Sequence, residues 1–537
     1  MSRRGYLAIV LHAHLPFVRH PEHPRSMEER WLFEALAECY LPLLGAFERL
    51  KRAGVPFAIT MSLTPPLAAM LRDELLRRRF EDYLSRIEKL AEKETIRLQG
   101  DDRFRPVAQF YVENLIEVRR TWQRIRGDVV GALVSYADAQ QIDLISCAAT
   151  HAYLPGLLPT RRALRAQLRL GMRAFEHLTG RRPMGIWLPE CAYAPEFDAE
   201  IAHAGFRYTI VDSHGVGFAH PRPPFGYFAP IASSNGVAFF ARDPESSKQV
   251  WSRQEGYPGD AYYRDFYRDV GFELPADYLG DEVGPFGART MTGLKYYRIT
   301  GPTEEKEPYQ PGVALERAAV HAENFLTNRI AQVGYWADRL PVSPIVVAPY
   351  DAELFGHWWF EGPSFLENFF RQLHKTRAAG EQTLEAITLR GYLERHPVMV
   401  RATAAASSWG TGGYGDVWIG PESSKLWRHV HHAGRYVTWL VDRHRAAEGA
   451  KGRALDRAIV ELLLLQSSDW GFIMTTKTVA PYAWARVRAH VHRLRHLGHL
   501  IQKPGLEPSD VAFIDDLTSR DNFLADVPSE WLRSAFD

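Results

Sequence analysis

Seven short apolar runs occur along this chain, and longer stretches with helical periodicity lie between most of them. The runs are Leu7–Leu11, Phe57–Ser62, Ile142–Ala148, Gly185–Leu188, Tyr208–Val211, Val237–Phe240 and Ile345–Ala348. Continuous apolar runs of this kind are typical of strands buried on both faces. Strands that alternate with helices predict a parallel sheet with right-handed crossovers. Seven such units predict an α/β fold, an incomplete TIM-like (β/α)7 barrel that lacks one unit of the full barrel.

The clearest helical pattern covers Glu28–Arg52, where apolar side chains fall on one stripe. Pro42 predicts a kink in this helix, because proline lacks the backbone N–H that a helix interior needs. Gly54 follows as an expected C-terminal cap. A second helix, Pro195–His203, begins with a proline in its first turn and ends before Gly205.

Two insertions interrupt the alternation and indicate how the chain divides. Residues 66–140 are charged and helix-patterned, which predicts a helical insertion. Residues 243–312 carry little periodicity; a loop of this length is usually functional or disordered, and its many aromatic residues favour an ordered wall of the active site. Beyond about residue 400 the strand pattern fades. We therefore expect a catalytic barrel from residues 1–65 and 141–399, and an all-helical C-terminal domain from residues 400–537 that contributes to the cleft.

Composition narrows the class of protein. The 537 residues are too many for one simple core, and a net charge of +1 gives no electrostatic basis for binding nucleic acid or an anionic membrane. No apolar run is long enough to span a bilayer, and Leu7–Leu11 is too short for a secretory signal. The three cysteines, Cys39, Cys147 and Cys191, argue against a disulfide framework and predict a cytoplasmic protein.

Two carboxylates, Glu190 and Asp351, each follow a predicted buried strand and stand among aromatic residues. Barrel enzymes place their chemistry at the carboxyl ends of the strands. In a retaining glycosidase one carboxylate attacks the anomeric carbon, while the other protonates the leaving oxygen and then deprotonates the acceptor. The alternative is that both acids only cap helices, which Asp does well and Glu less well. Two acids in such similar settings favour the catalytic interpretation.

Three histidines follow predicted strands, His12 and His14 after the first and His151 after the third. Histidines there can hydrogen-bond sugar hydroxyls or ligate a metal, so a metal-dependent deacetylase on a similar barrel is the rival enzyme class. That class resembles an arrangement with an acid pair at strand one and two histidines four residues apart at strand three. Here Pro155 takes the second histidine position and strand one carries no acid, which disfavours that class. A buried histidine bonded to backbone remains the alternative for at least one of the three.

The glycine-rich segment from Ser407 to Trp418 also carries aromatic residues. Its glycines match the dinucleotide-binding fingerprint in form, but no helix opens directly after them, so the match is accidental. We interpret the segment as a mobile loop whose Trp409 and Trp418 offer ring faces to sugars, with core packing as the alternative. Asp469 follows a predicted helix end, where it can supply a carboxylate that binds hydroxyls.

Five motifs occur in an order that resembles glycoside hydrolase family 57, and most closely its 1,4-α-glucan branching enzymes. They are His12–Phe17, Thr150–Pro155, Trp187–Tyr193, Tyr350–Trp358 and Ser467–Trp470. The resemblance covers essentially the whole chain. It implies the (β/α)7 barrel, the helical insertion, the helical C-terminal domain and a retaining mechanism without metal or organic cofactor.

The resemblance also implies roles for single residues, with Glu190 as nucleophile and Asp351 as acid/base. The implied substrate-binding residues are His12, His14, His151, Tyr193, Arg264, Gly280, Trp409, Trp418 and Asp469, with Trp418 gating the cleft. The implied reaction cleaves an α-1,4 bond of amylose, glycogen or starch and transfers the chain to a C6 hydroxyl. α-Amylases and 4-α-glucanotransferases of the family share the catalytic pair and are the alternative. A glucan-binding module that has lost catalysis would lack one carboxylate, and both are present.

Overall fold

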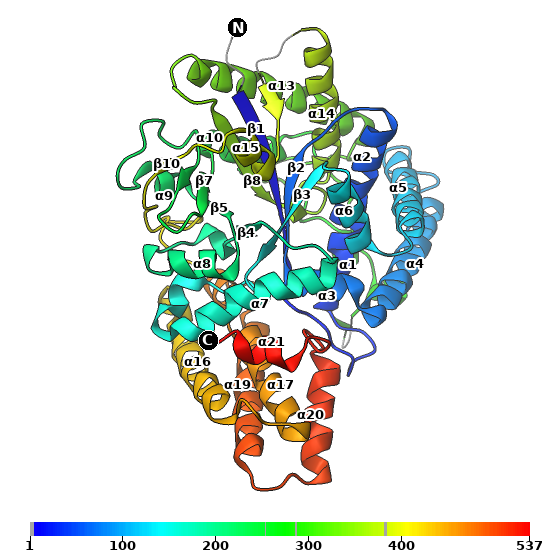
Figure 1. The fold of residues 1–537 in the computed structure, drawn as a ribbon. Helices are drawn as coiled ribbons and strands as arrows, with labels where there is room; N and C mark the ends of the chain where they lie inside the picture. The colour runs from blue at the N-terminus through cyan, green and yellow to red at the C-terminus, as the bar shows by residue number, and fades with distance from the viewer. Residues whose placement is uncertain (1–4, 253, 285–286, 381–383) are drawn as a thin grey trace.

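The computed structural model describes residues 5–252, 254–284, 287–380 and 384–537. Within them, seven parallel strands form a curled sheet at the centre of the molecule (Figure 1). These are β1 (Gly5–Ala13), β2 (Ile59–Leu63), β3 (Ile142–Cys147), β4 (Gly185–Trp187), β5 (Tyr208–Val211), β7 (Ala238–Ala241) and β8 (Ile345–Asp351). Their order across the sheet is β8-β1-β2-β3-β4-β5-β7. The seven predicted strands and the incomplete barrel are confirmed.

The two ends of this sheet meet at one point. Arg242, directly after β7, forms an isolated parallel bridge with Val347 of β8. The backbone N–H of Asp243 donates a hydrogen bond of 2.8 Å to the carbonyl of Val347. The barrel is thus closed by one contact instead of by an eighth strand, and that contact holds Arg242 beside the strand that ends at Asp351.

Three short strands extend the sheet, and the sequence pattern does not predict them. β6 (Ile231–Ala232) pairs antiparallel with β7, β10 (Val400–Arg401) pairs with β6, and β9 (Leu384–Ala386) pairs with β1. Each is too short to show a two-residue period, so only the pairing itself identifies it.

The helix after β1 is interrupted where Pro42 predicts a kink. It comprises α1 (Glu29–Ala35), a wide π-helical turn (Leu36–Tyr40) and α2 (Leu41–Arg52). Pro42 cannot donate to the carbonyl of Glu38 four residues earlier, so the backbone widens there. Gly356 lies against that carbonyl, and a Cβ at position 356 would approach it to 1.8 Å. The kink therefore lets the loop after β8 approach this helix closely.

The predicted helical insertion consists of four helices. They are α3 (Pro65–Arg72), α4 (Glu74–Arg97), α5 (Arg105–Arg124) and α6 (Val129–Asp138). α4 and α5 pack against each other at the side of the barrel (blue in Figure 1). α7 (Arg161–Thr179) follows β3, and α8 (Asp198–Ala204) follows β4 and ends at Gly205, which has the predicted left-handed conformation with φ 101°.

The long loop after β7 is ordered in its described part, as its aromatic content predicts; residues 253, 285 and 286 lie outside that part. It contains α10 (Pro244–Trp251), α11 (Val270–Glu273) and α12 (Ala276–Leu279). The buried carboxylate of Asp269 accepts hydrogen bonds from the backbone N–H groups of Gly271, Thr292 and Gly293, which ties the loop together. α13 (Pro311–Ala337) precedes β8 in the chain and α14 (Gly362–Ala378) follows it, and these two helices pack against each other. α15 (Leu389–Arg395) follows β9.

The rest of the chain after β10 is helical where it has regular structure. The helices are α16 (Ser424–His444), α17 (Gly449–Leu465), α18 (Ser468–Thr476), α19 (Ala480–Gln502), α20 (Pro508–Arg520) and α21 (Ser529–Ser534), and they gather at one end of the barrel (Figure 1). α18 docks on the loop after β3, because the backbone N–H of Ser468 donates to the carbonyl of His151 at 2.9 Å. No helix in the described ranges is long and apolar enough to cross a membrane. The division into separately folding domains stays a prediction.

Candidate active site

Five of the predicted site residues lie at the carboxyl ends of β1, β3, β4 and β8: His12, His14, His151, Glu190 and Asp351. His12 lies directly opposite Asp351 on β8 and opposite Ser62 on β2 in the strand register. Glu190 follows β4 in a short 3-10 turn, Pro189–Cys191. Adjacent parallel strands end at the same edge of the sheet, which is why residues far apart in sequence meet here.

The backbone that carries Glu190 is strained. Glu190 has φ 66° and Cys191 has φ 51°, both in the left-handed region that disfavours residues with a Cβ. His151, after β3, has φ 58°. Such conformations cost about 1–3 kcal/mol each and persist where the surroundings enforce them, most often at functional sites.

The carboxylate of Glu190 is held by two side chains from the C-terminal part of the chain. The indole N–H of Trp409 donates to Oε2 at 2.7 Å, and the hydroxyl of Ser468 donates to Oε1 at 2.9 Å. The backbone N–H of Trp409 also donates to the carbonyl of Glu190 at 2.8 Å. Two segments far from Glu190 in the sequence therefore fix its carboxylate.

Behind Ser468 a chain of hydrogen bonds runs through two buried histidines. Nδ1 of His151 lies 2.8 Å from Oγ of Ser468, Nε2 of His151 lies 3.0 Å from Nε2 of His12, and Nδ1 of His12 lies 3.1 Å from Oγ of Ser62. Because Ser468 donates to an ionised Glu190, it accepts from Nδ1 of His151, so Nε2 of a neutral His151 accepts from His12. Burial lowers the pKa of both histidines well below the usual value, which keeps them neutral. Every donor in the chain then points toward Glu190.

The two carboxyl groups differ in how well their charged forms are stabilised. Burial raises the pKa of Asp351 well above its usual range, the charges of Glu353 and Glu190 raise it further, and Arg242 opposes them. Burial also raises the pKa of Glu190 to about 7, although its two hydrogen bonds favour the carboxylate. Among the described residues none donates a hydrogen bond to the carboxyl group of Asp351. The two hydrogen bonds therefore favour the negative charge on Glu190, and burial without a donor favours the proton on Asp351, which is the distribution that an acid and a nucleophile require.

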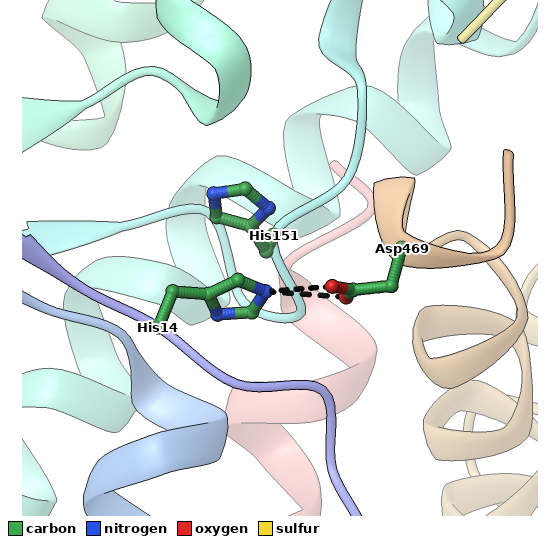
Figure 2. A group of neighbouring side chains, drawn as sticks. All are labelled: His14, His151 and Asp469. Carbon is green, nitrogen blue, oxygen red and sulfur yellow. Dashed lines mark hydrogen bonds and ion pairs between the residues drawn. The ribbon is translucent and has the colours of Figure 1, made fainter. Parts of the chain in front are cut away.

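Asp469 and His14 are joined by hydrogen bonds beside this pair of acids. Nε2 of His14 lies 3.1 Å from Oδ2 of Asp469 (Figure 2). Nδ1 of His14 lies 3.0 Å from Oγ1 of Thr64. Burial alone would raise the pKa of Asp469, but the charge and hydrogen bond of His14 lower it to about 2. The rings of His14 and His151 stack with centroids 3.8 Å apart.

His14, His151 and Asp469 are close enough to hold a metal ion. However, all four ring nitrogens of the two histidines already have protein partners. A cation at this point would have to break the His14–Asp469 pair and one bond of His151. The donor set therefore fits a hydrogen-bonded polar cluster better than a metal centre.

Two other predicted residues lie beneath the site instead of in it. Tyr193 is 1 % exposed and packs on Phe197 and Phe239. Trp418 is 3 % exposed and stacks on Tyr153 with ring centroids 5.5 Å apart. In this structure neither ring offers a face to a ligand, so the expectation that the loop presents Trp418 to sugars is not met; Trp409 of the same loop is partly exposed.

No contact among the described residues links Arg264 or Gly280 directly to the carboxyl group of Glu190 or Asp351. The guanidinium of Arg264 is buried, donates to Glu38 at 3.1 Å and lies over the ring of Phe360. Gly280 is exposed at the end of α12, and no described contact links it to Glu190. Their assignment to substrate binding stays a prediction.

Sequence reasoning missed several residues of the site. Ser62 and Thr64 orient His12 and His14, Glu353 accepts from the backbone N–H of His14 at 3.2 Å, and Ser468 bridges His151 to Glu190. Ser62 and Thr64 end or follow a predicted strand, as the histidines do, so their position offered a usable indication. Glu353 stands two residues after Asp351 in the same aromatic motif, so its position also offered an indication.

Comparisons with known proteins show which family the chain belongs to. The family model described as glycosyl hydrolase family 57 matches residues 8–403, and a model described as the C-terminal region of 1,4-alpha-glucan branching enzymes matches residues 429–531. The 1,4-alpha-glucan branching enzyme TK1436 of Thermococcus kodakarensis is 33 % identical over 97 % of this chain and 77 % of its own length.

Two solved structures are similar over nearly their full length. The alpha-amylase AmyC from Thermotoga maritima has a TM-score of 0.90 at 35 % identity and covers 99 % of both chains. A branching enzyme from Pyrococcus horikoshii has a TM-score of 0.86 at 32 % identity and covers 98 % of this chain and 96 % of its own. On the extent of the family match and of these relatives, the chain belongs to glycosyl hydrolase family 57.

Proposed function

We propose that this protein is a retaining 1,4-α-glucan branching enzyme, with Glu190 as nucleophile and Asp351 as acid/base. The observation that carries the branching assignment is the match of residues 429–531 to the C-terminal region of branching enzymes. The relatives from Thermococcus kodakarensis and Pyrococcus horikoshii, named as branching enzymes, support it. The polarised pair of carboxyl groups supports the chemistry, because one is held as a charged acceptor and the other keeps its proton.

In the proposed mechanism Glu190 attacks the anomeric carbon of an α-1,4-linked glucan while Asp351 donates its proton to the leaving C4 oxygen. The ionised Asp351 then takes the proton of a C6 hydroxyl, whose oxygen attacks the anomeric carbon and breaks the ester bond to Glu190. Both carboxyl groups return to their starting state. Neither step needs a metal or an organic cofactor.

Beside the carboxyl pair, His14, Trp409 and Asp469 are the residues that we propose to contact sugar. Trp409 is partly exposed next to Glu190, and His14 and Asp469 present polar groups beside it. The C-terminal helices are part of this cleft, because Asp469 and Ser468 come from α18. We also propose a cytoplasmic location, since Cys39, Cys147 and Cys191 are free and buried.

An α-amylase is the second candidate, because AmyC is 35 % identical with a TM-score of 0.90. Incubation with amylose separates the two functions. Proton NMR that detects new α-1,6 linkages without a matching rise in reducing ends supports branching. Reducing ends without α-1,6 linkages would show an amylase, and α-1,4 chains of altered length would show a 4-α-glucanotransferase.

A further inference from the structure

A surface pocket of about 280 Å³ lies next to the carboxyl pair and has no part in the mechanism above. It is lined by Asp212, Arg242, Pro244, Ser247, Lys248, Trp251 and Ser252. Most of these residues belong to α10 and the turn before it, at the carboxyl end of β7.

The pocket adjoins the Asp351 side of the site. Its Arg242 bridges to Val347 on the strand that ends at Asp351, and the charge of Arg242 acts on that carboxyl group. The guanidinium of Arg242 also lies 5.7 Å from the ring centre of Trp409, the residue that binds Glu190. Arg242 and Trp409 therefore connect the pocket to both carboxyl groups.

Two exposed tryptophans stand at this pocket. Trp251 ends α10 and is 41 % exposed, and Trp358, in the loop after Asp351, is 45 % exposed. Their rings meet edge to face with centroids 6.1 Å apart, and Trp251 lies 6.3 Å from Trp409. Large exposed indole rings are costly to leave in water, so two of them beside a polar pocket indicate a ligand that stacks on them.

The charges of the pocket select a neutral ligand. Arg242 is paired with Asp212 at 3.3 Å and donates to Ser247 at 2.9 Å, and Lys248 is paired with Glu255. Both cations among the described residues that line the pocket are thus paired with carboxylates, and neither is left to balance an anion. An array of fixed donors and acceptors beside aromatic faces suits a sugar, whose hydroxyls bond to the polar groups and whose C–H faces lie on the electron-rich rings.

We propose that Trp251 and Trp358, with this pocket, form the subsite that binds the acceptor glucan chain. The inference rests on the proposed function, in which Asp351 deprotonates the acceptor hydroxyl. An acceptor must therefore approach on the Asp351 side, where both tryptophans lie. The transferred chain, in contrast, is bonded to Glu190 while the acceptor binds.

The test separates formation of the glycosyl-enzyme from its transfer. α-Maltosyl fluoride is the donor, because fluoride release reports attack by Glu190 without an acceptor, and maltotetraose is the added acceptor. Trp251→Ala and Trp358→Ala are compared with Trp439→Ala. Trp439 is 40 % exposed on α16 and packs on Tyr436, so it matches the exposure without lying at the site.

Each site variant is expected to raise the maltotetraose concentration for half-maximal transfer about tenfold, the effect of about 1.4 kcal/mol of lost stacking, and to favour hydrolysis. The rate of fluoride release without acceptor should change less than twofold, and the melting temperature should change by less than about 3 °C. The control variant Trp439→Ala should match the parent protein in all three measurements. The proposal is overturned if the double variant Trp251→Ala/Trp358→Ala needs the same maltotetraose concentration for half-maximal transfer as the parent protein. It is also overturned if fluoride release without acceptor falls as much as transfer does, because the tryptophans would then bind the donor. If the parent protein forms no α-1,6 linkage, the branching function fails, yet the half-saturation for transfer still decides the subsite.

Discussion

The indole N–H of Trp409 donates a hydrogen bond of 2.7 Å to the carboxylate of Glu190, 219 positions earlier in the chain. A second bond, from the backbone N–H of Trp409 to the carbonyl of Glu190, doubles the attachment. The glycine-rich loop thus contacts the strained turn after β4 and stabilises the charged form of the Glu190 carboxyl group. The loop therefore acts on the charge of the site as well as carrying Trp409, which we propose contacts sugar.

Trp409→Phe should move the acidic limb of the pH–rate profile to higher pH. The ring remains, but the carboxylate loses a donor that favours its charged form, so the pKa of Glu190 rises further above about 7. We expect kcat near neutral pH to fall about tenfold, since a hydrogen bond to a charged group contributes about 1.5 kcal/mol. Trp418→Phe is the control, because the buried N–H of Trp418 has no partner among the described residues and donates nothing to Glu190. A limb that stays in place in Trp409→Phe would contradict the assignment.

Azide rescue should distinguish the roles of the two carboxyl groups. In Glu190→Gly, azide attacks an α-glycosyl fluoride directly and yields the β-glycosyl azide. Glycine is chosen because it tolerates the φ of 66° at this position. In Asp351→Ala, the glycosyl-enzyme still forms from the fluoride, and azide yields the α-glycosyl azide. The anomeric coupling constant in proton NMR identifies each product, and the opposite pairing of variants and products would show that the roles are exchanged.

Glu190→Gln should stabilise the folded protein above pH 7 and have less effect at pH 5. The folded pKa of about 7 lies above the ordinary 4.5, so the folded state binds more protons between these values, and its stability falls as pH rises through that window. The difference between these two pKa values lowers the free energy of unfolding at alkaline pH by at most about 3 kcal/mol. The uncharged Gln avoids this loss of stability. Melting temperatures of both proteins from pH 5 to 9 provide the measurement. If the melting temperatures of the two proteins differ by the same amount at every pH, the pKa of Glu190 in the folded protein is not raised.

Arg264→Met should lower stability more than it weakens substrate use. The substitution leaves the carboxylate of Glu38 without its arginine partner. Burial raises the pKa of Glu38, whereas the charge of Arg264 and the contacts of His357 and Lys295 lower it to about 2. Breaking a buried pair costs about 3–5 kcal/mol. The double variant Arg264→Met/Glu38→Gln should recover part of the lost melting temperature while KM for amylose stays near the parent value. A large rise in KM with little loss of stability would instead support the substrate-binding role predicted from the sequence.

The sequence alone determined the seven strands, the helical insertion, the helical C-terminal part and the positions of Glu190 and Asp351. These features depend on local periodicity and on the position of an acid after an apolar run, which neighbouring residues reveal. The kink at Pro42 and the cap at Gly205 belong to the same class, because each follows from the covalent structure of one residue.

Only the tertiary structure decided which side chains act on these two acids. The chain of hydrogen bonds from Ser62 to Glu190 joins five residues from five separate segments, and no local pattern encodes it. Burial of Tyr193 and Trp418, and exposure of Trp251 and Trp358, likewise depend on what packs above each ring. Sequence periodicity specifies which face of an element is apolar, but the neighbour that covers a given ring is chosen by the packing of segments hundreds of positions apart.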